Sequence, residues 1–130
     1  MTDPIADFLI QLKNASMARK SQISIPSSKM KEALAQVLFK EGFIGKVAVS
    51  ATDKVKKRLS IQLRYVDKMP SITGVVKVST PGRRMYVEKN SLSRIMRGIG
   101  TIIVSTPEGI MSGKQARKKG LGGEIICKIW

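Results

Sequence analysis

Hydrophobic residues in this chain repeat with two different periods, and this pattern constrains its fold more than any other feature of the sequence. Residues 5–12 place apolar side chains at i, i+3, i+4 and i+7, which is the spacing of one face of an α-helix. Residues 59–65 alternate apolar and polar side chains, as a strand with one buried face does. Because both periods occur in one short chain, we predict a mixed α+β fold. The helical set is Ile5, Phe8, Leu9 and Leu12, and the alternating set is Leu59, Ile61, Leu63 and Tyr65.

The first half of the chain is predicted to run helix, strand, helix, strand, strand. Asp3 and Pro4 suit the start of the first helix, because an aspartate accepts unpaired N–H groups and proline fits the first turn. Ser27 or Ser28 is a typical cap for the second helix, which Gly42 ends. The expected elements are a helix from residue 4, a strand at 22–26, a helix with Met30, Leu34, Val37 and Leu38 buried, and strands at 47–49 and 59–65 joined by a basic turn at 52–58.

The second half is predicted to be mainly β, with short helices. Ser112 and Gly120 are typical caps for the start and end of one such helix at residues 113–119. Residues 67–71 are polar and contain Pro70, as linkers often do. We therefore predict two small domains, 1–66 and 72–130, joined by 67–71. The expected elements of the second are strands at 72–80, 84–87, 101–104 and 124–129, and helices at 91–96 and 113–119.

The charge of the chain indicates a polyanionic partner. Its 130 residues include 24 lysines and arginines against 9 aspartates and glutamates, a formal net charge of +15. The hydrophobic fraction of 42% is that of a folded globular protein and not of a disordered basic tail. Because a strongly basic folded domain is typical of nucleic-acid-binding proteins, we expect the partner to be a nucleic acid.

The sequence lacks the side chains that most reaction centres need. It contains no histidine, which removes the commonest general base and the commonest metal ligand together. Residues 109–115 resemble a phosphate-binding loop only superficially, since the spacing is one residue short and Gln115 replaces the hydroxyl residue that holds magnesium. Cys127 lies in an alternating segment without an activating neighbour, so we expect an inert strand residue. We predict no enzymatic activity, no metal site, no cofactor and no small-molecule substrate.

The sequence also suggests where the protein works. The first residues have neither a basic segment nor an apolar one, so no secretory signal is expected. No apolar run approaches the roughly 20 residues of a membrane span. We therefore expect a location in the cytoplasm or in an organelle stroma, with no membrane partner.

Two small hydroxyl residues, Ser105 and Thr106, follow the strand expected at 101–104. Their hydroxyls can both donate and accept, which suits a ribose 2′-OH in the shallow minor groove of A-form RNA. The alternative is an ordinary turn in which the same hydroxyls bond to nearby backbone. Aromatic residues make up only 5% of the chain, which favours a folded RNA over a single strand as the target.

Basic residues at two helix positions are candidates for phosphate contacts. Lys114, Arg117 and Lys118 lie on the helix expected at 113–119. Lys29 and Lys31 lie in the first turn of the second helix, where they oppose the helix dipole unless an anion is near. For these two lysines, a solvated surface position is an equally good interpretation.

Three further positions can contribute to RNA recognition. Gly122 and Gly123 lack a Cβ, so their backbone N–H groups can be approached closely. Glu124 can accept from a base amino group, or it can form a salt bridge with a neighbouring basic residue. Tyr86 is flanked by cations and can stack on an unpaired base, with a core position as the alternative.

Short motifs along the whole chain resemble those of one known family. They are Thr2-Asp3-Pro4-Ile5-Ala6-Asp7, Ile25-Pro26-Ser27-Ser28-Lys29, Ser79-Thr80-Pro81-Gly82-Arg83-Arg84-Met85-Tyr86, Ser105-Thr106-Pro107 and Gly120-Leu121-Gly122-Gly123-Glu124. In order and in overall length they resemble the bacterial-type eighth family of small-subunit ribosomal proteins. Each motif is weak alone, but the combination is specific.

The resemblance implies a two-domain α+β protein that binds a central-domain helix of small-subunit ribosomal RNA early in assembly. It also implies neighbouring ribosomal proteins as partners and, in many members, repression through a segment of the protein's own operon mRNA. The family's loop is frequently Ser-Thr-Ser, whereas Pro107 takes the third place here and removes one hydroxyl and one N–H. The family's main RNA contacts correspond to Ser105, Thr106, Gly122, Gly123, Glu124 and Tyr86. Any contact expected at the third loop position falls to Ser105, Thr106 or the backbone carbonyl of Pro107.

From the residues and the resemblance together we expect a structural RNA-binding protein of the small ribosomal subunit. The charge is expected to supply broad phosphate affinity, and the segments around Ser105 and Glu124 are expected to select one irregular RNA site. The alternative is an RNA-binding regulator or ribosome-assembly factor that acts away from the ribosome.

Overall fold

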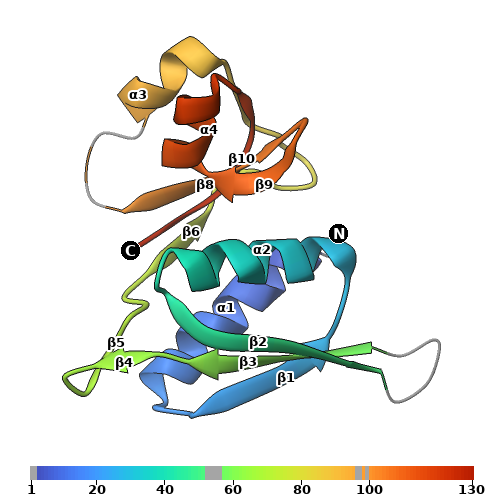
Figure 1. Cartoon of the computed structure of the whole chain (residues 1–130), viewed down its shortest axis with the longest axis vertical. Helices are drawn as coiled ribbons and strands as arrows, with labels where there is room; N and C mark the ends of the chain where they lie inside the picture. The colour runs from blue at the N-terminus through green and yellow to red at the C-terminus, as the bar shows by residue number, and fades with distance from the viewer. Residues whose placement is uncertain (1–2, 52–56, 96–97, 99) are drawn as a thin grey trace. The chain divides into compact units, whose positions relative to one another are not determined.

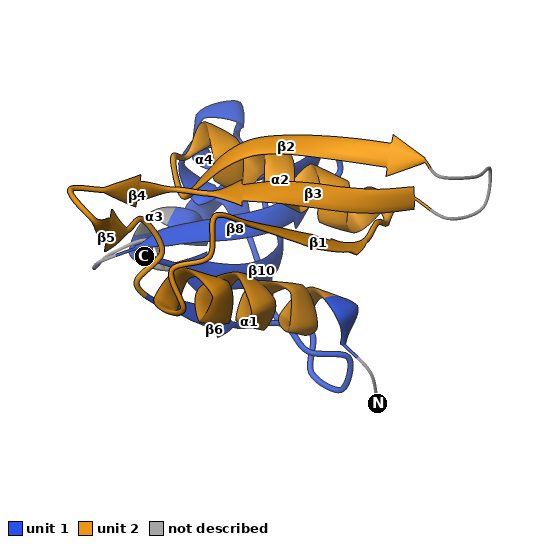
Figure 2. Ribbon diagram, turned by 90° about the horizontal axis from the view of Figure 1, so that it is seen from below, with its two compact units in different colours: residues 1–4, 74–130 blue, residues 5–73 orange. Residues whose placement is uncertain are grey.

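The computed structural model describes residues 3–51, 57–95, 98 and 100–130, and the chain forms two compact units. One unit comprises Ile5–Thr73, and the other comprises residues 1–4 with 74–130 (Figure 2). The linker expected at 67–71 contains the strand β5 (Met69–Pro70), which pairs with β4 (Tyr65–Val66) in a short hairpin. The domain boundaries drawn from the sequence remain a prediction.

The first unit packs two helices against one face of an antiparallel sheet with strand order β1-β3-β2 (Figure 1). The elements are α1 (Pro4–Met17), β1 (Gln22–Pro26), α2 (Lys29–Lys40), β2 (Ile44–Ala51) and β3 (Lys57–Leu63). This confirms the predicted order of helix, strand, helix, strand, strand. Most of the basic turn expected at 52–58 lies outside the described residues.

The apolar patterns of the first half are buried almost as expected. The predicted face of α1 is buried throughout, and so are Leu59, Ile61 and Leu63 of β3. The strand expected at 59–65 ends at Leu63, and Tyr65 lies in β4 and is partly exposed. Ser28 caps α2 by accepting a hydrogen bond from the Lys31 backbone N–H. The expectation for α2 is partly wrong: Met30 lies in the first turn and is exposed, and Val37 is only half-buried. The buried stripe begins one turn later and consists of Leu34, Ala35 and Leu38.

The second unit is built around β10 (Gly123–Ile129), which takes partners on both sides. The strand β8 (Thr101–Thr106) pairs along one side of β10, and β9 (Gly109–Ser112) pairs with β8. On the other side, β6 (Val75–Lys77) and β7 (Tyr86–Val87) pair with different parts of β10. The short helices are η1 (Lys89–Ser91), α3 (Leu92–Ile95) and α4 (Gly113–Lys119). The predicted α+β class with a mainly β second half is therefore confirmed.

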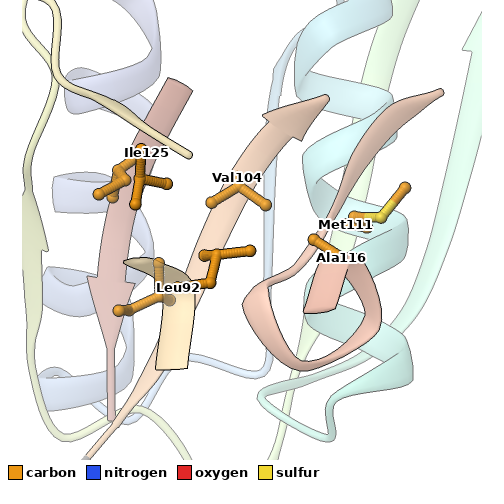
Figure 3. Packing of buried hydrophobic residues seen from close by; sticks show 7 residues of the cluster. Leu92, Val104, Met111, Ala116 and Ile125 are labelled. Atoms are coloured by element: carbon orange, nitrogen blue, oxygen red, sulfur yellow. The ribbon is translucent and has the colours of Figure 1, made fainter. Parts of the chain in front are cut away.

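One face of this sheet carries the core of the second unit, where helices α3 and α4 meet the strands. Figure 3 shows Leu92 of α3 and Ala116 of α4 beside the strand residues Val104, Met111 and Ile125. The completely buried members gain on the order of 2 kcal/mol each from leaving water. The cluster consists of Val87, Leu92, Ile102, Val104, Met111, Ala116 and Ile125.

Several strand boundaries in the second half differ from the prediction. The strand expected at 72–80 contains only β6, whose regular pairing with β10 ends at Lys77 opposite Cys127. At the same point of β10, between Ile125 and Cys127, its register against β8 shifts. The N–H groups of Val78 and Ser79 still bond to β10, but outside regular strand geometry. The strand expected at 84–87 is likewise reduced to β7. Conversely, β8 extends to Thr106, and β9 was not predicted at all.

Candidate nucleic-acid interface

Three candidate residues from distant parts of the sequence lie in one row across the second sheet. Glu124 on β10 is directly opposite Tyr86 on β7 and directly opposite Ser105 on β8. Residues opposite each other in antiparallel strands project from the same face, with Cβ atoms about 5 Å apart. Since Ile125 and Val104 point into the core, this row points away from it.

The row combines an aromatic ring, an ion pair and a hydroxyl. Tyr86 is 72% exposed, which rules out the core position considered from the sequence. Arg84 donates to the Glu124 carboxylate, with 2.9 Å between Arg84 Nη1 and Glu124 Oε1. The salt bridge considered for Glu124 is therefore present. Ser105 is partly exposed, and within the described part of the chain its hydroxyl makes no hydrogen bond. The row thus offers an open face for stacking and a free donor and acceptor.

Close packing of the strands explains Gly122, just before β10, and Gly123, its first residue. A Cβ on Gly123 would collide with the carbonyl oxygen of Ser105, and one on Gly122 would lie 2.5 Å from the carbonyl oxygen of Val87. The sequence suggested that these glycines leave their N–H groups accessible. The structure shows a separate requirement, because β10 can enter between β7 and β8 only without side chains at these positions.

Thr106 and Pro107 form the end of the β8–β9 hairpin. The Thr106 hydroxyl donates to the carbonyl of Gly109 at 2.8 Å and accepts from the N–H of Glu108 at 3.2 Å. Thr106 is only 9% exposed, and its hydroxyl bonds to the backbone of its own turn. This agrees with the alternative interpretation of the sequence, an ordinary turn with local hydrogen bonds. Pro107 is exposed at the tip. Ser105 and Thr106 belong to the strand and not to a following loop, and they point to opposite faces.

The basic helix α4 forms as the sequence predicts. Ser112 accepts from the Gln115 backbone N–H at 3.1 Å, and Gly120 adopts the left-handed conformation at φ 67°. Its basic residues Lys114, Arg117 and Lys118 are exposed. However, α4 buries Ala116 against the core face of the sheet. The row containing Glu124 occupies the opposite face, so the structure does not place both groups on one flat surface.

Lys29 and Lys31 belong to the other compact unit. Lys29 is exposed at the start of α2. The Lys31 ammonium donates to the carbonyl of Pro26 at 3.2 Å, so part of its hydrogen-bonding capacity is already used within the protein.

The groups that could carry out chemistry are few. Burial raises the pKa of Cys127 from its ordinary value of 9.0 to about 12, and the charge of Lys77 opposes this shift. The thiol therefore stays protonated near neutral pH, as expected for an inert strand residue. Within the described ranges, no three His, Cys, Asp or Glu residues are grouped to hold a metal ion. No helix among these residues is long and apolar enough to cross a membrane.

Comparison with known proteins agrees with the motifs in the sequence. The family described as "Ribosomal protein S8" matches residues 3–130. The chain belongs to the ribosomal protein S8 family. It is 45% identical over 130 residues to the small ribosomal subunit protein uS8 of Opitutus terrae, covering 100% of both chains. It is 47% identical over 129 residues to uS8 of Burkholderia mallei, covering 99% of this chain and 98% of that protein.

S8 proteins are structural proteins of the small ribosomal subunit and not enzymes, in agreement with the sequence-based expectation. A further relative, uS8 of Dictyoglomus turgidum, is 45% identical over 130 residues, covering 100% of this chain and 98% of its own. Among residues near the row, sequence reasoning missed Arg84. The pair Arg83-Arg84 just before Tyr86 was the available signal, but only the pairing of β7 with β10 shows that Arg84 reaches Glu124.

Proposed function

We propose that this S8-family chain binds directly to a central-domain helix of small-subunit ribosomal RNA as a primary assembly protein. The row of Tyr86, Glu124 and Ser105 is the recognition surface in this proposal. The observation that carries the proposal is the register across three strands, which gathers an exposed ring, a carboxylate and a hydroxyl that no described residue bonds to on one face of the sheet.

Each member of the row has a distinct role in the proposed complex. The exposed ring of Tyr86 stacks on an unpaired base, a contact worth roughly 1–3 kcal/mol. The Ser105 hydroxyl bonds to a ribose 2′-OH. Glu124 accepts from a base amino group or orients Arg84 toward a phosphate. Gly122, Gly123 and the turn containing Thr106 and Pro107 hold the strands in this register.

Basic residues outside the row supply affinity without sequence preference. Lys114, Arg117 and Lys118 of α4 are exposed, and they are proposed to contact phosphates that flank the recognised site. Lys29 and Lys31, which belong to the other unit, are proposed to add contacts with the RNA backbone. The net charge of +15 supports this division between steering and selection.

The same surface is proposed to bind a segment of the protein's own operon mRNA, where that segment copies the shape of the ribosomal site. An RNA-binding regulator or assembly factor that acts away from the ribosome remains the alternative function. Stable stoichiometric sedimentation of the protein with small subunits would count against this alternative.

Hydroxyl-radical footprinting on naked small-subunit ribosomal RNA tests the proposal. The protein is added at physiological salt with an excess of competitor RNA, and Tyr86→Ala is compared with Tyr86→Phe. We expect one compact footprint on an irregular helix, lost with Tyr86→Ala and kept with Tyr86→Phe because the ring remains. Diffuse protection that competitor RNA removes would contradict the proposal, since charge alone would then explain binding.

A further inference from the structure

The two edges of the first sheet differ in whether they can accept another strand. In the order β1-β3-β2, strands β1 and β2 are the edges, and β2 is visible at the margin of the sheet in Figure 2. A sheet edge presents every second residue with its N–H and C=O turned outward. An edge can accept another strand only if these outward N–H and C=O groups are not already hydrogen-bonded within the protein.

The hydrogen bonds of β3 identify the outward residues of β2. The Leu63 N–H donates to Ser21, and the Ser27 N–H donates to Lys57, so the odd-numbered residues of β3 face β1. The even-numbered residues of β3 then face β2, where Ser60 pairs with Ala48. Consequently, the backbone groups of Val47 and Val49 point away from the sheet. Within the described residues neither has a hydrogen-bond partner on this outer side.

The same alternation shows that the outer edge of β1 is closed. Its outward residues are Gln22, Ser24 and Pro26. The Ser24 carbonyl accepts from Arg58 Nη2 at 2.9 Å, and the Pro26 carbonyl accepts from the Lys31 ammonium at 3.2 Å. Pro26 also has no N–H to offer. An added strand would have to displace two cationic side chains, whereas no side chain among the described residues bonds to the outward groups of Val47 and Val49.

The side chains around β2 indicate what kind of strand would fit. Val49 is 46% exposed although it lies on the face that the helices cover, so its burial is incomplete. Lys46 is exposed on the other face, and Lys57 lies opposite Ala51 at the far end. The three strands of this sheet contain no carboxylate. A segment that alternates apolar and acidic residues matches both faces, while a second copy of this basic edge would be repelled.

We propose that the outer edge of β2 binds an extended segment of a neighbouring small-subunit protein, with apolar side chains over Val49 and an acidic one near Lys46. The added strand bonds to the N–H and C=O groups of Val47 and Val49 and so extends the sheet. This inference rests on the proposed role in the small subunit, but its residues belong to the first unit and none of them is a member of the row around Glu124.

Hydrogen exchange measured by mass spectrometry tests the proposal. Exchange in residues 47–51 is followed in the free protein, in its complex with ribosomal RNA alone, and in particles assembled with the other small-subunit proteins. Val49→Pro removes one outward N–H that has no partner within the sheet, a substitution that an edge strand tolerates. Val49→Ala shortens the same side chain but keeps the N–H, which makes it the matched control.

We expect exchange in residues 47–51 to slow by about tenfold or more only when the other proteins are present. Val49→Pro should abolish this protection and Val49→Ala should keep most of it. Protection by RNA alone would overturn the proposal, because RNA would then cover the edge. Protection that grows with concentration of the free protein would overturn it in favour of a second copy, and no protection at all would overturn it outright.

If Val49→Pro fails to fold, the comparison of hydrogen exchange in the wild-type protein alone, with RNA and in assembled particles still tests the proposal. Co-sedimentation with naked ribosomal RNA is measured in the same preparations, so the two proposals are tested separately. Suppose that the protein does not bind RNA but that residues 47–51 are protected from exchange in assembled particles. This result would contradict the proposed RNA binding and would support the proposed strand addition at β2.

Discussion

Arg84 and Glu124 form an ion pair between the segment preceding β7 and the start of β10, with 2.9 Å between Arg84 Nη1 and Glu124 Oε1. The arginine side chain is 49% exposed and that of the glutamate only 17%. Solvent screening limits the pair's contribution to stability to about 0.5 kcal/mol. Its larger consequence is the position of the cation, because Arg84 is held at the carboxylate that lies directly opposite Tyr86.

Replacement of this cation should change the salt dependence of RNA binding. We expect Arg84→Gln to reduce the slope of log affinity against log salt by up to about 0.9, since one phosphate contact is lost. Lys118→Ala on α4 should produce a similar change. Filter binding to the central-domain RNA over a range of salt concentrations measures both slopes. An unchanged slope for either variant would mean that its side chain faces solvent in the complex.

Ser105 and Thr106 should respond differently to the same substitution. Ser105→Ala removes a hydroxyl that has no hydrogen-bond partner among the described residues, so RNA affinity should fall while the free energy of unfolding is nearly unchanged. Thr106→Ala removes both hydrogen bonds of the hairpin hydroxyl and should cost about 1–2 kcal/mol of stability. Urea unfolding and RNA binding measured on both variants separate the two effects. Equal stability losses would contradict the assigned roles.

Gly123→Ala should destabilise the second unit more than any single surface substitution. The new Cβ would meet the backbone of Ser105, which cannot move without breaking the pairing of β8 with β10. We expect a loss of about 3 kcal/mol in the free energy of unfolding. Gly120→Ala is the control: its Cβ would meet nothing within 4 Å, so only the left-handed φ of 67° costs energy, about 1 kcal/mol. Comparable losses in the two variants would argue against a steric requirement at Gly123.

Cys127 should resist alkylation in the native protein. Burial raises the pKa of its thiol from 9.0 to about 12, so the reactive thiolate fraction at pH 8 falls by about a thousandfold. The pKa is higher folded than unfolded, so this thiol weakens stability as pH rises from 9.0 towards 12. Iodoacetamide labelling with and without urea measures the difference in reactivity. Similar rates in both conditions would show that the thiol is accessible in the folded state.

Local signals in the sequence identified the helices well. The spacing of residues 5–12 predicted the buried face of α1, and Ser28, Ser112 and Gly120 cap helices where expected. These features depend on residues three or four positions apart, so nearby sequence contains the necessary information. Met30 departs from the pattern because periodicity indicates which face of a helix is apolar. It does not indicate at which residue the rest of the protein begins to bury that face.

Strand extents and pairings in the second unit were harder to predict. Four residues from Gly109 to Ser112 are too few to show a period, so β9 was missed. The strand expected at 72–80 is apolar enough along its length, but its regular pairing ends at Lys77, opposite the point where β10, about 50 residues later, is irregular against β8. No window around β6 contains that information.

The sequence by itself determined the α+β class, both long helices, the basic character and the identity of most candidate residues. Only the tertiary structure decided that Tyr86, Glu124 and Ser105 share one face and that the Thr106 hydroxyl bonds within its own turn. It also decided that cationic side chains bond to the outer carbonyls of β1, whereas no described residue bonds to the outer groups of Val47 and Val49 in β2. The physical reason is the range of the interactions. Helical periods and caps act within a turn or two, whereas strand register is settled by packing between segments far apart in the chain.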